Sequence, residues 1–117
     1  MTSRSRSARP SFGQGIRTAV VRTDQRYLAD ARRRLDQLTL HGTFAEALAF
    51  VTGYDAARAS SYLAGFQQWL TMRGGAPKGT PLADLIRSAA GADADDGRTT
   101  ATLFDLLDEY LETKVPG

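Results

Sequence analysis

Apolar residues recur at steps of three and four along the chain between residues 55 and 75. This spacing places them on one stripe of an amphipathic helix. The stripe consists of Ala59, Tyr62, Leu63, Phe66, Trp69 and Leu70. Asp55 suits the N-cap of this helix, and Gly74 suits its carboxyl end. Because the stripe is bulky, we predict that it forms the central helix of a bundle and that Trp69 is buried in the core.

The same periodicity predicts four further helices. The first is long, from about Phe12 to Leu40, with a bend near residues 22–24. The other three cover Phe44 to Thr52, Thr80 to Gly91, and about Thr100 to Lys114. No run of residues shows the sustained alternation that is typical of a strand.

The turn between the first two predicted helices has the sequence of a capping box. His41 and Gly42 end the first helix, and Thr43 precedes the second, with Glu46 three residues later. A threonine and a glutamate at this spacing cap each other's backbone amides. His41 is the only histidine of the chain, and no nucleophile or acid at an informative spacing supports a catalytic role. We therefore assign His41 to the helix end.

These elements predict an all-α fold, a small single-domain bundle of about five helices with short connections. Residues 1–12 alternate serine and arginine, and we expect a disordered basic tail there, followed by one helical domain over residues 13–117. The length of 117 residues and the hydrophobic content of 42% suit one soluble domain. With no bilayer-spanning apolar run and no recognisable signal peptide, we expect a cytoplasmic protein without membrane contact.

Charge is distributed unevenly between the two ends of the chain. Residues 1–34 hold nine arginines against Asp24 and Asp30, whereas residues 91–117 hold seven acids against Arg98 and Lys114. The first segment is therefore +7 and the second −5. Either the two ends pair inside the fold, or a charged partner binds one of them.

Motifs for catalysis or metal binding are missing from the sequence. The chain has no cysteine, and residues 74–80 lack the residue order of a phosphate-binding loop. The acidic loop that starts at Asp93 departs from a calcium loop, since Gly97 comes one position early and Phe104 stands where glutamate is needed. We expect neither a cofactor nor a metal, and no enzymatic activity.

The remaining hypothesis is a non-catalytic protein-interaction module. A concentrated acidic surface would complement a basic partner protein, in the way that immunity proteins and antitoxins bind and block another protein. The candidate partner-binding residues are Asp93, Asp95, Asp96, Asp105, Asp108, Glu109 and Glu112.

The alternative hypothesis is non-specific binding of nucleic acid by the basic tail and the first helix. Its candidate residues are Arg22, Arg26, Arg32, Arg33 and Arg34. A helix-turn-helix is not indicated, because the second predicted helix is too apolar and too short for recognition. The competing interpretation of these arginines is a solvated face that pairs with the acidic end of the chain. The sequence leaves the partner and the oligomeric state open.

Overall fold

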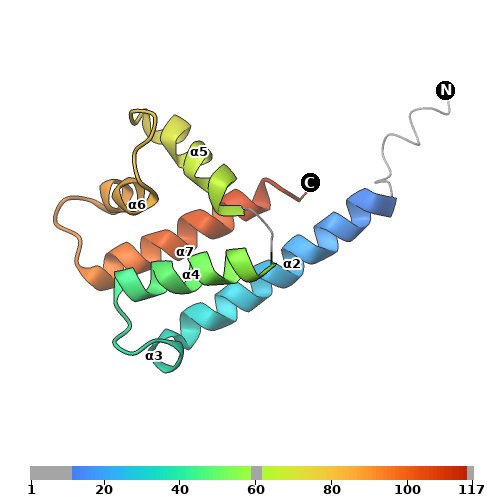
Figure 1. Ribbon diagram of the computed structural model, residues 1–117, viewed down its shortest axis with the longest axis horizontal. Coiled ribbons are helices and arrows are strands. Elements are labelled where there is room, and N and C mark those ends of the chain that lie inside the picture. The colour runs from blue at the N-terminus through green and yellow to red at the C-terminus, as the bar shows by residue number, and fades with distance from the viewer. Residues whose placement is uncertain (1–11, 59–61, 116–117) are drawn as a thin grey trace.

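The computed structural model describes residues 12–58 and 62–115, and all the regular secondary structure within them is helical, which confirms the predicted all-α fold. The predicted tail lies outside these residues, apart from Phe12. The helices are α2 (Phe12–Arg33), α3 (Leu35–Leu38), α4 (Phe44–Arg58), α5 (Tyr62–Gly74), α6 (Leu82–Ala90) and α7 (Asp96–Glu112) (Figure 1). None of the helices in this part of the chain is long and apolar enough to cross a membrane.

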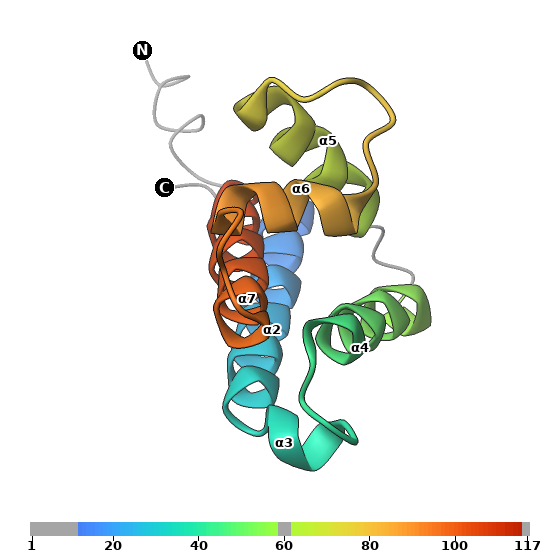
Figure 2. The same ribbon diagram turned by 90° about the vertical axis from the view of Figure 1, so that its left-hand side faces the viewer.

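The central helix of the bundle is α7, which contacts α2, α4, α5 and α6 (Figures 1 and 2). Its buried apolar residues are spaced three and four apart, so they form one face of the helix. They are Leu103, Phe104, Leu107, Tyr110 and Leu111. Buried side chains from the neighbouring helices complete a single core around this face.

The segment from residue 55 to residue 75, predicted as the central helix, is not one helix. Its first residues belong to the end of α4, which continues past Gly53 to Arg58, and α5 begins at Tyr62. Asp55 still caps α5, because its carboxylate accepts hydrogen bonds from the backbone N–H of Tyr62 at 2.8 Å and of Leu63 at 3.4 Å. The helix predicted to end at Thr52 therefore continues through Gly53, since a glycine inside a helix costs only about 1 kcal/mol.

Trp69 packs against the core but is less buried than predicted. Phe66 and Leu70 are buried, whereas Trp69 is half-buried at the margin of the core. Its ring lies 5.6 Å from the Tyr110 ring, and the Arg73 guanidinium lies 4.8 Å from the Trp69 centroid. Because α5 packs at the side of α7 rather than at the centre, part of its aromatic stripe faces solvent.

The first predicted helix is interrupted at Arg34, where α2 gives way to the short α3, and not at residues 22–24. The capping box that follows is confirmed. Glu46 N–H donates to the Thr43 hydroxyl at 3.2 Å, and the Glu46 carboxylate accepts from Thr43 N–H at 3.2 Å. The Thr43 amide is the main cause that holds the pKa of Glu46 below its ordinary value. The same carboxylate accepts from His41 N–H at 2.8 Å.

The last two helices start at other residues than predicted. The N-cap of α6 is Pro81 rather than Thr80, whose hydroxyl donates instead to the Pro77 carbonyl at 2.7 Å. The helix α7 starts at Asp96, ahead of the predicted Thr100, because the Asp95 carboxylate caps it by accepting from Arg98 N–H at 2.8 Å.

Candidate functional site

The acidic face of α7 meets cationic side chains from α2 and α5. The ion pairs are Arg22–Glu112 at 2.6 Å, Arg32–Asp105 at 2.6 Å and Arg73–Glu109 at 2.5 Å. Asp108 accepts a hydrogen bond from Gln25 at 3.2 Å. Rising numbers on α2 thus pair with falling numbers on α7, so the two helices run antiparallel and side by side.

These contacts place the two charged ends of the chain against each other. The hydrogen bond from Arg22, followed by the one from Gln25, holds the pKa of Glu112 below its ordinary value. All three ion pairs are well exposed, and exposed pairs contribute little stability individually. They nevertheless reduce the negative charge that α7 offers to a partner. Binding of a basic protein to this face stays a prediction.

Removal of the four charges on α7 is expected to lower the melting temperature, because the arginines of α2 and α5 lose their partners. Because the pKa of Glu112 is lowered in the folded state, its carboxylate stabilises the fold at pH values above the ordinary carboxyl pKa. This stabilisation is lost as the pH falls through the pKa of the folded state. The variant carries Asp105→Asn, Asp108→Asn, Glu109→Gln and Glu112→Gln. Thermal denaturation at low salt and at about 1 M salt measures the effect, which should shrink as salt screens the pairs. Asp93→Asn is the control. A variant as stable as the wild type at low salt would contradict the internal pairing.

Two of the three acids in the predicted acidic loop cap helices. Asp95 caps α7, and the carboxylate of Asp96 accepts from the backbone N–H of Phe44 at 2.6 Å, at the start of α4. Asp93 is exposed. Across residues 12–58 and 62–115, no group of three or more His, Cys, Asp or Glu side chains is placed to hold a metal ion.

The arginines predicted to contact nucleic acid are mostly paired with carboxylates. Arg22 and Arg32 pair with α7 as described above. Arg33 and Arg34 both pair with Asp30, at 3.2 Å and 3.4 Å. Among the described residues, Arg26 is the one member of the set without a carboxylate partner. The five side chains therefore do not form an uncompensated basic stripe.

Asp24, which was not among the residues predicted from the sequence, has a side chain that is 0% exposed. It accepts hydrogen bonds from the hydroxyls of Tyr54 and Tyr62, the latter at 2.7 Å, and Arg58 Nη2 lies 3.0 Å from its Oδ1. These partners come from α4 and α5, so one carboxylate joins three helices. The available signal was position: Asp24 lies three residues after Val21 and four before Leu28, on the buried stripe of α2.

The Asp24 cluster, formed by Asp24, Tyr54, Arg58 and Tyr62, is a structural clamp. Burial, and then the hydrogen bond to Asp24, raise the pKa of Tyr54 and of Tyr62 above the ordinary value of 10.0. Both phenols therefore remain protonated donors at neutral pH. Because the carboxylate is buried and already bound by three donors, it is not placed to contact a substrate.

Stability is expected to fall as pH rises above about 10. The raised pKa of Tyr54 and Tyr62 means that folding favours the protonated phenols. The stabilisation from the protonated phenols is complete at pH values below the ordinary tyrosine pKa. It is lost as the pH rises through the pKa of the folded state. Urea unfolding between about pH 8 and pH 12 measures the decline. The double variant Tyr54→Phe, Tyr62→Phe should decline less steeply than the wild type, whereas Tyr27→Phe should not. Equal slopes for all three proteins would count against the clamp.

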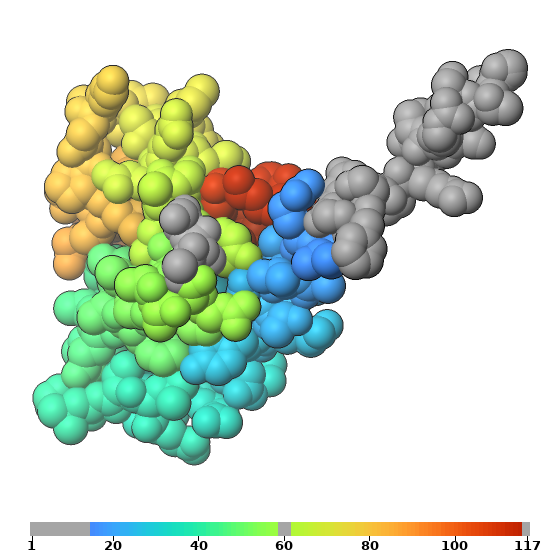
Figure 3. Space-filling view, turned by 45° about the vertical axis from the view of Figure 1, so that its right-hand side comes forward, coloured from blue at the N-terminus to red at the C-terminus, as the bar shows by residue number. Residues whose placement is uncertain are grey.

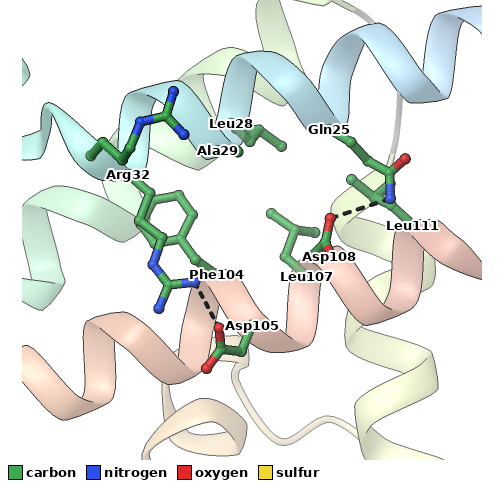
Figure 4. Close-up of a pocket in the computed structure, with 10 residues that line it drawn as sticks. Gln25, Leu28, Ala29, Arg32, Phe104, Asp105, Leu107, Asp108 and Leu111 are labelled. Atoms are coloured by element: carbon green, nitrogen blue, oxygen red, sulfur yellow. Dashed lines mark hydrogen bonds and ion pairs between the residues drawn. The ribbon is translucent and has the colours of Figure 1, made fainter.

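One groove runs between α2 and α7 and has a volume of about 330 Å³ (Figure 4). Leu28, Phe104 and Leu107 line it with apolar surface. Four polar side chains of its lining are joined in pairs, Arg32 to Asp105 and Gln25 to Asp108 (dashed lines in Figure 4), and Arg33 pairs with Asp30 outside it. The volume is at the small end for a ligand pocket. Since its charged groups already have partners within the chain, this groove is best described as the contact line between two packed helices.

A second groove, the amino-end groove, has a volume of about 530 Å³ and lies where the start of α2 meets α5 and the end of α7. In Figure 3 the blue start of α2 lies next to the red end of α7. Side chains that line it include Ile16, Arg17, Val20, Arg58, Tyr62 and Lys114. Ile16 is 49% exposed and Val20 is 42% exposed, so apolar surface remains open to solvent there.

The only histidine, His41, is exposed beside the capping box, with Nδ1 3.4 Å from the Glu46 carboxylate. This placement agrees with a role at the helix end. Comparison with protein families, with characterised proteins and with solved structures found no match to this chain. Its function is therefore inferred from its own residues.

Proposed function

We propose that this chain is a non-catalytic protein-interaction module and that its docking surface is the amino-end groove. The observation that carries the proposal is the exposure of Ile16 and Val20 at the end of α2 that extends past the bundle (Figure 1). The two residues are four apart, so they form one continuous apolar surface on the helix. Apolar anchors at this spacing are a recurring means of helix docking between proteins.

The apolar pair favours a protein partner over nucleic acid. Contacts to nucleic acid without sequence preference are made mainly to phosphates by cationic and polar groups. Such contacts would leave Ile16 and Val20 exposed, whereas a protein surface with its own apolar side chains would cover them. Binding that blocks the partner, as immunity proteins and antitoxins do, is the specific form of this proposal.

The hypothesis of a basic partner on the acidic face of α7 has less support. Asp105, Glu109 and Glu112 already pair with arginines of the same chain. A basic partner would have to displace these arginines or add to a surface that is close to neutral. The amino-end groove requires no such displacement, because Ile16 and Val20 face solvent.

The test compares the proteins retained by three immobilised forms of the full chain. The variant Ile16→Asp, Val20→Asp removes the apolar surface, and Met72→Asp is the matched control at an exposed apolar side chain elsewhere. We expect at least one protein to bind the wild type and the control but not the double variant, with equal melting temperatures. Identical sets of bound proteins for all three forms would overturn the proposal.

A titration with duplex DNA addresses the alternative function. Non-specific binding by the arginines should appear at low salt and weaken steeply as salt increases, because bound counterions are released from the phosphates. If this binding is lost in the Ile16→Asp, Val20→Asp variant and no protein partner is found, nucleic-acid binding replaces the proposal.

A further inference from the structure

We propose that the amino-end groove binds an acidic segment of a partner protein, one that carries apolar side chains beside its carboxylates. This inference rests on the proposed function. It assigns an acidic partner, whereas the acidic end of the sequence suggests a basic one. The groove combines cations with exposed apolar side chains and offers no accessible carboxylate among the described residues that line it.

The cations of the groove come from three segments that are far apart in the sequence. Arg17 lies on the first turns of α2, Arg58 ends α4 and Lys114 follows α7. The single carboxylate in the lining is Asp24, which is 0% exposed and 3.0 Å from Arg58. The surface that a partner meets is therefore positive.

The three cations retain donors for a partner. Arg17 has no carboxylate partner within the part of the chain that the structure describes. The ammonium of Lys114 lies 5.0 Å from the Tyr110 ring, and this cation–π contact does not engage all three of its N–H donors. Arg58 uses Nη2 for Asp24, but its side chain is 40% exposed and a guanidinium carries five donors in all.

The apolar surface lies among these cations. Ile16 and Val20 flank Arg17 along α2, and the groove volume of about 530 Å³ has room for several side chains. A segment with leucine, isoleucine or phenylalanine beside aspartate or glutamate would satisfy both kinds of surface. Burial of the apolar residues would provide affinity, and the charges would provide steering and selectivity.

Other occupants fit the charges less well. A second copy docked through α2 would bring two segments of +7 together, since residues 1–34 hold nine arginines and two acids. The preceding residues of the same chain carry Arg4, Arg6 and Arg9 without an acid, so they would be repelled. Duplex DNA has the right charge but no apolar side chains to cover Ile16 and Val20.

The probe for this proposal is a display library of random 12-residue peptides, selected on the full chain. We expect selected peptides to combine acidic and apolar residues. Their affinity should fall at least about tenfold for the charge-reversal variant Arg17→Glu, Lys114→Glu, the loss of about 1.4 kcal/mol of interaction free energy. It should fall as salt increases. Arg98→Glu, at an exposed arginine near the opposite end of α7, is the matched control and should bind normally.

The other outcomes separate this inference from the proposed function. Selected peptides that are neutral or basic, yet need Ile16 and Val20, would overturn the acidic partner and keep the docking surface. Selected peptides that bind all groove variants equally, or no selected peptides, would overturn both. Concentration-dependent self-association that the charge-reversal variant loses would identify a second copy as the occupant and overturn the inference. Binding of random-sequence duplex DNA that is weakened by the same variants would identify nucleic acid as the ligand. It would overturn both the inference and the proposed function.

Discussion

Replacement of Asp24 by alanine is expected to lower the free energy of unfolding by about 2 to 4 kcal/mol. The variant leaves the hydroxyls of Tyr54 and Tyr62 without an acceptor, and an unsatisfied buried polar group costs about 1 to 3 kcal/mol. Loss of one partner of a buried ion pair costs about 3 to 5 kcal/mol when the remaining charge is also buried. Arg58 is partly exposed and regains water, so we expect less than the full sum. Urea denaturation at pH 7, followed by circular dichroism, measures the change.

Two further variants control this result. Asp24→Asn keeps the shape and one acceptor, so its loss should be smaller than that of the alanine variant. Asp30→Ala removes an acid from the same helix whose ion pairs to Arg33 and Arg34 are exposed, and its effect should stay below about 1 kcal/mol. A loss for Asp24→Ala no greater than that for Asp30→Ala would show that the Asp24 cluster does not hold the bundle together.

The Asp24 cluster connects stability with the proposed docking surface. Three of its members, Asp24, Arg58 and Tyr62, also line the amino-end groove. The same hydrogen bonds that join α2, α4 and α5 therefore fix the position of one cation and one aromatic ring of that groove. A substitution at Asp24 should weaken peptide binding even under conditions in which the protein remains folded.

Local sequence signals predicted the parts of the fold that depend on neighbours in the chain. The Thr43–Glu46 capping box forms because its donors and acceptors are three residues apart, within one helical turn. Asp55 was predicted as the residue directly before the next helix, but it lies inside α4; the part of this prediction that holds is that its carboxylate accepts from the first amide of α5. Capping requires only that the Asp55 carboxylate reaches the free amides at the start of α5. The presence of an aspartate therefore does not determine the path of the backbone between the cap and the helix.

Tertiary contacts decided what the sequence did not predict. Trp69 lies on the apolar stripe of α5, but which part of the stripe is covered depends on how α5 crosses α7. The uneven charge was visible in the sequence, whereas the pairing of Arg22 with Glu112 needs the antiparallel register of α2 and α7. Asp24 could have been recognised as a polar residue on a buried stripe, but its partners come from two other helices.

The amino-end groove could not be predicted from the sequence either. Ile16 and Val20 belong to a helical apolar pattern, which predicts burial against the bundle. Their exposure follows from length: α2 extends past the end of α7, so its first turns are covered on part of their surface only (Figure 1). Only the assembled bundle shows which residues of the stripe remain uncovered.

Substitution of Gly65 by alanine is expected to destabilise the protein by about 1 to 3 kcal/mol, the usual cost of overpacking. A Cβ atom at Gly65 would lie 2.1 Å from the Tyr110 hydroxyl oxygen and 3.2 Å from Cζ. The Tyr110 ring is buried, and its centroid lies 5.6 Å from those of Phe66 and Trp69, so it has little freedom to move aside. The close approach of α5 to α7 therefore requires glycine at this position. Thermal and urea denaturation measure the loss.

Gly53→Ala is the matched control, because Gly53 also lies within a helix and a Cβ atom there would meet nothing within 4 Å. Alanine should stabilise α4 at that position by up to about 1 kcal/mol. The two substitutions should change the free energy of unfolding in opposite directions. Because both replace a helical glycine by alanine, this difference separates the effect of the contact with Tyr110 from that of helix propensity. The double variant Gly65→Ala, Tyr110→Phe removes the hydroxyl that the new methyl group would meet, so it should be less destabilised than the two single losses added together. Simple additivity of the two losses, or a stabilising Gly65→Ala, would show that α5 and α7 can separate without penalty.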